Sequence, residues 1–252
     1  MIDHRLVQDT LISNDPWAVS HGYIASCGFL GTNLLYYTLA YMLPALTAVV
    51  LGSGGGVVPR FIAEAQRDIP DATFQKKRRL ILIDADNNDK GFGAPLYHNN
   101  PDHPLHKDFP EIEVWKMTTD EAISHLKQRG LEIDYLHIDA DHTFIQSLKD
   151  LEGYLPLMSE DFIITLHDTA LEHLEMHHDG CIPRLIAHLR KEMEKGGRYE
   201  HLEMINFNLR KMQKTNFFQK RLDCCGTAII KPKVATMWDK QMEGLSWLAG
   251  TT

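Results

Sequence analysis

The sequence predicts one α/β domain in which helices cover both faces of a doubly wound, mostly parallel sheet of seven strands. The length of 252 residues is within the usual range for one such domain. Short apolar runs alternate with amphipathic helical segments, as in a parallel sheet with helical crossovers. A glycine-rich turn follows the first apolar run, where open parallel sheets bind their ligands.

Each element follows from local pattern. The expected strands are the apolar runs 47–51, 80–83, 112–117, 135–138 and 162–166, followed by two closing strands at 199–207 and 226–231. The expected helices are 34–43, 57–66, 119–128, 144–157 and 182–194. The Pro-, Gly-, Asn- and His-rich segment 91–110 predicts a long loop or lid. We expect residues 1–33 to form a helical or irregular extension and residues 34–252 to form the main domain.

Composition excludes several classes of protein. The 34 acidic against 26 basic residues give a formal charge of −8, which disfavours binding to nucleic acid or to an anionic membrane surface. The four cysteines lack a CxxC spacing, so neither a disulfide framework nor a structural zinc site is indicated. No Asp, Glu, Lys or Arg lies between Asp15 and Arg60, but Asn33 and Pro44 interrupt that stretch, so no membrane span is expected. We expect a cytoplasmic protein.

The glycine-rich turn, Gly52 to Gly56, is the first candidate ligand site. Glycine allows positive φ and lets a ligand approach the backbone. Val57 stands where a dinucleotide-binding turn has its third small residue, and no Gly-Lys-Ser/Thr follows, so NAD is disfavoured and a P-loop is excluded. A turn without ligand remains the alternative. Asp84, after the next strand, is expected to accept hydrogen bonds from the ribose hydroxyls of an adenosine, with Asp86 as second choice.

A second candidate site comes from two further strand ends. Asp139 and Asp168 each end an expected strand, so both should point into the cleft beside the glycine turn. Carboxylates of this kind bind Mg²⁺, Mn²⁺ or Ca²⁺. His167 would shift the preference toward later transition metals if it is a ligand.

These motifs carry a resemblance to a known family. The spacing Gly52-x-Gly54-x-Gly56 and the segment 135–169, YLHIDADHTFIQSLKDLEGYLPLMSEDFIITLHDT, resemble class I S-adenosylmethionine-dependent methyltransferases with a Rossmann-like fold. More narrowly, the segment is similar to the metal-dependent O-methyltransferases of the catechol, caffeoyl-CoA and macrolide-sugar types. His167 departs from that family, in which an acidic residue is usual.

The resemblance implies a role for each matching residue. The implied metal ligands are Asp139, His167 and Asp168, holding Mg²⁺ or else Mn²⁺ or another transition metal, and the implied catalytic base is His142. The expected cofactor-binding residues are Gly52, Ser53, Gly54, Gly56, Asp84, Thr118 and Asp141. Asp141 either orients His142 or holds the amino group of the cofactor. A solvated position at a helix start is the alternative for His142.

The resulting hypothesis is transfer of a methyl group from S-adenosylmethionine to a hydroxyl of a small molecule such as a catechol, phenol or sugar. Metal and base would act together, because a cation lowers the pKa of the hydroxyl and a histidine removes its proton. One alternative is an iron oxygenase using His137-Ile-Asp139, and another is a non-catalytic cofactor-binding module.

For three further segments the sequence leaves more than one interpretation open. His98, His103 and His106 are more typical of a solvated loop than of a second metal site, although one of them could touch substrate. Segment 172–179 either lines the cleft or is a polar helix end. The tyrosines of helix 34–43 are expected in the core or at a contact between copies in a homo-oligomer.

Overall fold

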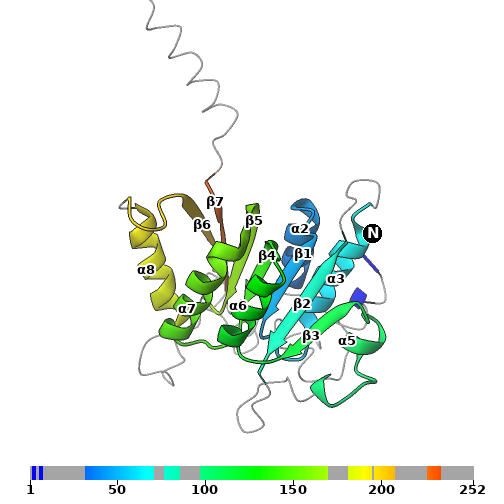
Figure 1. Ribbon diagram of the computed structural model, residues 1–252. Helices are drawn as coiled ribbons and strands as arrows, with labels where there is room; N and C mark the ends of the chain where they lie inside the picture. Colours follow the sequence, from blue (N-terminus) through cyan, green and yellow to red (C-terminus); the bar gives the residue numbers. More distant parts are fainter. Residues whose placement is uncertain are drawn as a thin grey trace, which may run out of the picture.

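The computed structural model describes residues 2–3, 6–7, 32–70, 77–85, 97–169, 181–194, 196–207 and 226–233. Within them, seven strands form one sheet in the order β3-β2-β1-β4-β5-β7-β6 (Figure 1). Strands β1 to β5 are parallel, and β7 runs antiparallel to both β5 and β6. The prediction of a doubly wound, mostly parallel seven-stranded sheet is confirmed.

The elements lie close to their predicted positions. The strands are β1 (Thr47–Leu51), β2 (Arg79–Asp84), β3 (Ile112–Lys116), β4 (Ile133–Ile138), β5 (Met158–His167), β6 (Leu202–Phe207) and β7 (Thr227–Pro232). The helices are α2 (Asn33–Met42), α3 (Val57–Asp68), α5 (Pro104–Lys107), α6 (Thr119–Gln128), α7 (Phe144–Tyr154) and α8 (Ile182–Glu194). After α7, Leu155–Leu157 form a 3-10 turn instead of the last helical residues that the sequence predicted.

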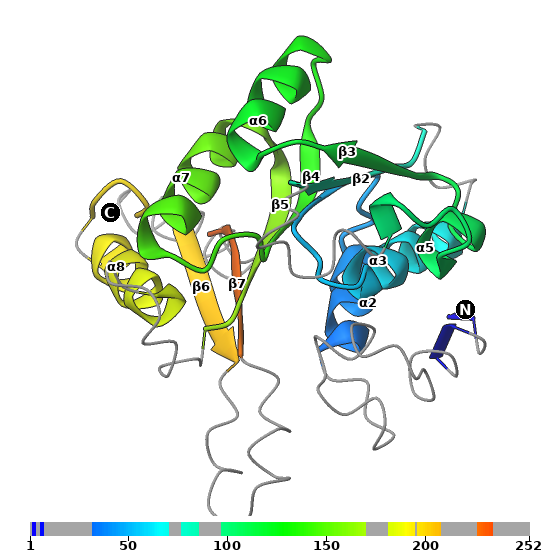
Figure 2. The same ribbon diagram turned by 90° about the horizontal axis from the view of Figure 1, so that it is seen from below.

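Helices cover both faces of the sheet (Figure 2). Helices α6, α7 and α8 pack on one face and α2, α3 and α5 on the other, each over its own apolar core. In β1 the side chains alternate between the two, with Val49 and Leu51 in the first core and Ala48 and Val50 in the second. A strand buried on both faces reads as a continuous apolar run, which is why this strand was visible in the sequence.

Backbone hydrogen bonds join the carboxyl ends of the central strands. The amide of Gly52, just after β1, donates to the carbonyl of Ile83 in β2 at 2.8 Å. The amide of Asp139, just after β4, donates to the carbonyl of Leu51 at 2.9 Å. Strand β1 therefore lies between β2 and β4 at the point where the strand order reverses, where α/β sheets bind ligands.

The expected lid is described from residue 97 onward, and Tyr97 and His98 are helical in addition to helix α5. His103 begins the one-turn helix α5, and its Nδ1 accepts a hydrogen bond from the amide of Leu105 at 3.2 Å. Leu105 is buried against Gly56 of the glycine turn. Residues 91–96 and Asp86 lie outside the described residues.

Little of the expected N-terminal extension lies within the described residues. Leu6 is buried in the same core as α2 and α3, and the amide of Asp3 donates to Glu64 of α3 at 2.8 Å. In the part of the chain that the structure describes, every helix is too short or too polar to cross a bilayer. The division into an extension and a main domain stays a prediction.

Candidate active site

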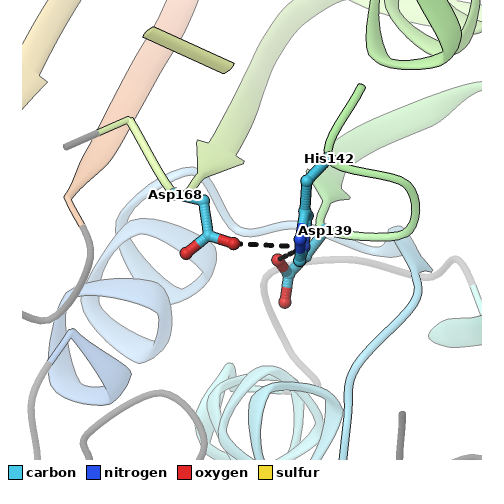
Figure 3. A group of neighbouring side chains, drawn as sticks. All are labelled: Asp139, His142 and Asp168. Carbon is cyan, nitrogen blue, oxygen red and sulfur yellow. Dashed lines mark hydrogen bonds and ion pairs between the residues drawn. The ribbon is translucent and has the colours of Figure 1, made fainter. Parts of the chain in front are cut away.

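Four side chains from the ends of β4 and β5 form what we call the Asp–His cluster. Asp139 directly follows β4, and His142 lies in the turn between β4 and α7. His167 is the last residue of β5, and Asp168 follows it. Parallel neighbouring strands end at the same edge of the sheet, so residues about thirty apart in sequence meet there (Figure 3).

The four side chains contact one another in a closed circuit. Nε2 of His142 lies 3.3 Å from Oδ1 of Asp139 and 3.1 Å from Oδ2 of Asp168. Nδ1 of His167 lies 3.2 Å from the same Oδ1 of Asp139 and 3.1 Å from Oδ1 of Asp168. Each carboxylate therefore contacts both imidazoles.

Exposure differs within the Asp–His cluster. The side chains of Asp139, Asp168 and His167 are only 8%, 7% and 4% exposed, whereas that of His142 is 34% exposed. Burying two carboxylates is costly unless hydrogen bonds and opposite charges compensate them. His142 is thus the member that a molecule arriving from solvent would meet first.

Asp168 has a strained backbone. Its φ is +61°, in the left-handed region that a non-glycine residue seldom adopts, although Asp tolerates it better than most. The residue is also buried. Such conformations persist where the surroundings enforce them, and they are concentrated at functional sites. Here the left-handed turn ends β5 directly beside His142.

Charges within the cluster shift its pKa values. Burial alone lowers the pKa of His142, but the hydrogen bond and charge of Asp139 and the charge of Asp168 outweigh it and raise that pKa to about 9. His167 behaves alike: burial opposes its charged form, yet Asp168 and Asp139 raise its pKa well above the usual value. Burial raises the pKa of Asp168, but the charge and hydrogen bond of His167 lower it by more than burial raises it. The pKa of Asp168 is therefore lowered overall. The carboxylates of the cluster therefore favour the charged form of both imidazoles.

The geometry of a possible metal site differs in one ligand from the set that the resemblance implied. Among the described residues, the group whose donor atoms could surround one ion is Asp139, His142 and Asp168, with all three atoms within 4.8 Å of one another. Its donors are two carboxylate oxygens and one imidazole nitrogen, which suit a divalent cation. His167 touches both carboxylates from the buried side and lies outside this group.

The glycine turn lies directly against the Asp–His cluster. A Cβ on Gly52 would stand 2.5 Å from the carbonyl oxygen of Asp139, so only glycine fits there. Gly52, Gly54 and Gly56 have φ values of +66°, +54° and +78°. Glycine adopts these at no steric cost. The predicted Ser53 is buried in the same turn.

Asp84, the predicted ribose ligand, is fixed by a residue that the sequence did not indicate. Its Oδ2 accepts a hydrogen bond of 2.6 Å from the hydroxyl of the fully buried Tyr97. Tyr97 lies in the segment expected to be a loop, where no periodicity marks a buried side chain. The apolar run Ala94-Pro95-Leu96-Tyr97 was the available signal, and it is a weak one.

Two other predicted cofactor residues have structural contacts. Thr118 caps α6 in a capping box, in which its hydroxyl accepts a hydrogen bond from the amide of Glu121 and its amide donates to the carboxylate of Glu121. Asp141 accepts a hydrogen bond of 2.7 Å from the amide of Thr143. The hydrogen bond and ion pair of His142 go to Asp139 and Asp168, so the structure gives no support to Asp141 as its orienting residue.

The competing interpretations of nearby histidines find no support. His137 is buried within the sheet, with Nδ1 2.8 Å from the hydroxyl of Thr165, and it lies outside the candidate metal group with Asp139. His98, His103 and His106 gather around Tyr97, and they too are outside any candidate metal group of the described residues. Segment 172–179 lies outside the described residues.

Comparison with known proteins agrees with this geometry. A family model described as a methyltransferase domain matches residues 49–169, which include the glycine turn, Asp84 and the whole Asp–His cluster. No curated protein matches the sequence.

Three solved structures have a similar fold. An O-methyltransferase from Bacillus cereus in complex with SAH aligns with a TM-score of 0.60 at 13% identity over 92% of both chains. The O-methyltransferase TomG from Streptomyces achromogenes, involved in tomaymycin synthesis and in complex with SAM, aligns at 0.57 and 13% over 92% of this chain and 91% of that one. An SAH-bound methyltransferase from Podospora anserina aligns at 0.56 and 13% over 92% and 89%.

At these identities the solved structures establish a shared fold, and the family match identifies a methyltransferase domain. The matched residues span β1 to the end of β5, where the glycine turn and the Asp–His cluster lie. Residues 49–169 are therefore a methyltransferase domain, and the chain shares its fold with methyltransferases that were solved with SAM or SAH.

Proposed function

We propose that this methyltransferase transfers the methyl group to a hydroxyl of a small molecule, with the Asp–His cluster as the acceptor site. The observation that carries the proposal is the direct contact between the cluster and the glycine turn. The backbone of Asp139 is bonded to β1, and the space for a Cβ on Gly52 is filled by the carbonyl of Asp139. A donor on the turn and an acceptor on the cluster would thus be neighbours, as an in-line displacement at about 3 Å requires.

The cofactor would lie along the glycine turn between Asp84 and the Asp–His cluster. The relatives from Bacillus cereus and Streptomyces achromogenes carry SAH and SAM, and the chain shares their fold. The proposed contacts are the backbone of the turn and the carboxylate of Asp84, with Thr118 and Asp141 nearby. S-adenosylmethionine supplies the electrophilic methyl group when bound.

A divalent cation is the proposed partner of Asp139 and Asp168. The two carboxylates supply oxygen donors, which suit Mg²⁺ and are compatible with Mn²⁺ or another transition metal, and the imidazole of His142 beside them stays available for proton transfer. A bound cation lowers the pKa of an acceptor hydroxyl. His167 lies behind the carboxylates at 3.1 to 3.2 Å and would hold them in place.

His142 is the proposed general base. It is the most exposed member of the cluster, and it can take the hydroxyl proton only in its neutral form. The charges of Asp139 and Asp168 keep its pKa at about 9, above neutral pH. Compensating those charges, as a cation would, removes the cause of the shift and favours the neutral imidazole.

The test combines calorimetry with an activity screen. We expect SAH to bind the chelator-treated protein, and labelled methyl transfer to small hydroxylated compounds to appear when Mg²⁺ or Mn²⁺ is restored. Asp139→Asn and Asp168→Asn should abolish transfer while SAH still binds. The matched control is Asp161→Asn, an exposed carboxylate at the other end of β5.

Each contrary result removes a defined part of the proposal. Transfer that is unaffected by chelation and by both substitutions would remove the cation. SAH binding without transfer to any hydroxylated compound would favour a non-catalytic cofactor-binding module.

A further inference from the structure

We propose that Tyr97 is a positioning residue of the cofactor site, which acts by holding the carboxylate of Asp84 in the orientation that binds the ribose. This inference rests on the proposed role of Asp84. Its basis is a contact between distant parts of the chain, because Tyr97 lies in the segment after β2 and Asp84 ends that strand.

The contact is a short hydrogen bond to a charged group. The Tyr97 hydroxyl donates to Oδ2 of Asp84 at 2.6 Å, and Tyr97 is fully buried whereas Asp84 is partly exposed. Hydrogen bonds to an ionised acceptor are shorter and stronger than neutral ones. The buried partner therefore fixes the rotation of a carboxylate that a ligand can still reach.

Tyr97 is itself held in place by the histidines of its own segment. Nε2 of His106 lies 2.7 Å from the carbonyl oxygen of Tyr97, so this nitrogen is the donor. The rings of His98, His103 and His106 lie 4.8, 6.0 and 6.5 Å from the ring of Tyr97, measured between centroids. The histidine-rich stretch thus has a structural use that its sequence alone did not indicate.

The same segment is fastened to helix α3. Arg67 of α3 lies over the ring of Phe109 at 4.2 Å, donates to the carbonyl of Asp108 at 2.6 Å and pairs with both oxygens of Glu111. Closer to the site, Leu105 fills the space next to Gly56. Segment 97–109, helix α3, the glycine turn and Asp84 consequently form one packed unit, which we call the glycine-turn wall.

Tyr97 can act as donor throughout the working pH range. Burial and the neighbouring charge of Asp84 raise the pKa of its hydroxyl, so the hydroxyl stays protonated. An acceptor that is oriented before binding loses less conformational freedom when the ligand arrives. Loss of the tyrosine hydroxyl removes a hydrogen bond that orients Asp84 before the ribose arrives, at a cost in affinity.

The experiment compares Tyr97→Phe with wild type by calorimetric titration of SAH and by steady-state kinetics. We expect the dissociation constant for SAH and the KM for S-adenosylmethionine to rise roughly tenfold, as for loss of one hydrogen bond to a charged group, with kcat little changed. The matched control is Tyr199→Phe, because Tyr199 is equally buried and donates to the carboxylate of Glu152 at 2.7 Å away from the cofactor site. It should bind SAH like wild type.

Two further measurements separate positioning from a general packing role. The Tyr97→Phe effect should vanish for an SAH analogue that lacks both ribose hydroxyls, and it should also vanish in an Asp84→Asn background. Placing 4-aminophenylalanine at position 97 retains a donor and should restore most of the affinity. This variant also serves as the test should Tyr97→Phe fail to fold.

The outcomes distinguish this inference from the proposed function. Wild-type affinity in Tyr97→Phe, or an equal loss for SAH and the analogue, overturns the role of Tyr97 and leaves the proposed function intact. Failure of the wild-type protein to bind SAH overturns both.

Discussion

The Asp–His cluster and the glycine-turn wall lie next to each other and are built differently. The cluster consists of four titratable side chains from two neighbouring strand ends. The wall consists of the glycine turn, the carboxylate of Asp84, helix α3 and segment 97–109, which supplies the neutral tyrosine that bonds Asp84. The Asp–His cluster has groups that can accept or donate protons, and the glycine-turn wall is a rigid surface on which a ligand can be held. An in-line methyl transfer needs both, since the acceptor must be deprotonated while the donor is held still.

The two regions also differ in what a substitution should do. Changes in the cluster alter charge and pKa with little change of shape, because Asn and Gln can replace Asp and His at similar volume. Substitutions at the glycines of the wall alter the shape of the site, because any replacement adds a side chain where glycine has none. The predictions below separate these two kinds of effect, beginning where the regions meet.

The largest combined effect on stability and activity is expected from Gly52→Ala, where the wall meets the cluster. An added Cβ would lie 2.5 Å from the carbonyl oxygen of Asp139, and the φ of +66° is itself unfavourable for alanine. Both backbones would have to move, so methyl transfer should fall at least about a hundredfold, since an ångström of misplacement can cost that much. Activity and chemical denaturation measure the result.

Gly130→Ala is the matched control for that substitution. Gly130 has a similar φ of +60°, but nothing lies within 4 Å of the Cβ position. It should lose only about 1–2 kcal/mol of stability from the backbone conformation and retain its activity. Equal losses in the two variants would mean that close packing against Asp139 is unimportant.

The second predicted effect concerns a substitution within the Asp–His cluster. His142→Gln keeps a polar side chain that cannot take a proton, so kcat should fall about 10²-fold or more while SAH affinity stays the same. Initial-rate kinetics and calorimetry report the two quantities separately. His201→Gln, an exposed histidine before β6, should behave like wild type. A normal kcat for His142→Gln would remove it as the base.

The same contrast explains which parts of the molecule could be predicted from the sequence. Strands buried on both faces are continuous apolar runs, and residues after neighbouring parallel strands share one edge. The meeting of Asp139 with Asp168 therefore followed from sequence order alone. Which imidazole would belong to the candidate metal group did not follow, because it depends on how the side chains of His142 and His167 are oriented toward the two carboxylates.

Most contacts of the glycine-turn wall could not be predicted from the sequence, for a physical reason. Tyr97 is buried in the apolar core beneath α2 and α3 and bonds Asp84, although its segment has no periodic apolar pattern. Arg67 reads in the sequence as an ordinary charge at a helix end, yet it anchors Phe109. Such side-chain contacts between distant segments leave no local signature, so the segment was predicted only as a loop or lid.

The smallest expected effect concerns a titrating group just outside the cluster. Asp150 of α7 is fully buried and accepts hydrogen bonds from Thr119 at 2.6 Å and Gln146 at 3.0 Å. Burial raises its pKa to about 6, although these two hydrogen bonds oppose the shift. The helix pair α6 and α7 thus holds a carboxyl group that is easier to bury when protonated.

The sign of the resulting pH dependence is opposite to that of a salt-bridged carboxylate. The folded pKa lies above the unfolded one, so the contribution of Asp150 is fully present below about pH 4 and is lost as the pH rises through about 6. Asp150→Asn removes this titration. Relative to wild type, the variant should therefore gain about 1–3 kcal/mol of unfolding free energy between pH 4 and pH 7. Urea denaturation at several pH values measures the difference, and a difference independent of pH would show that Asp150 ionises normally. Since Asp150 contacts neither the cluster nor Asp84, SAH affinity in this variant should stay unchanged, which separates stability of the fold from chemistry at the site.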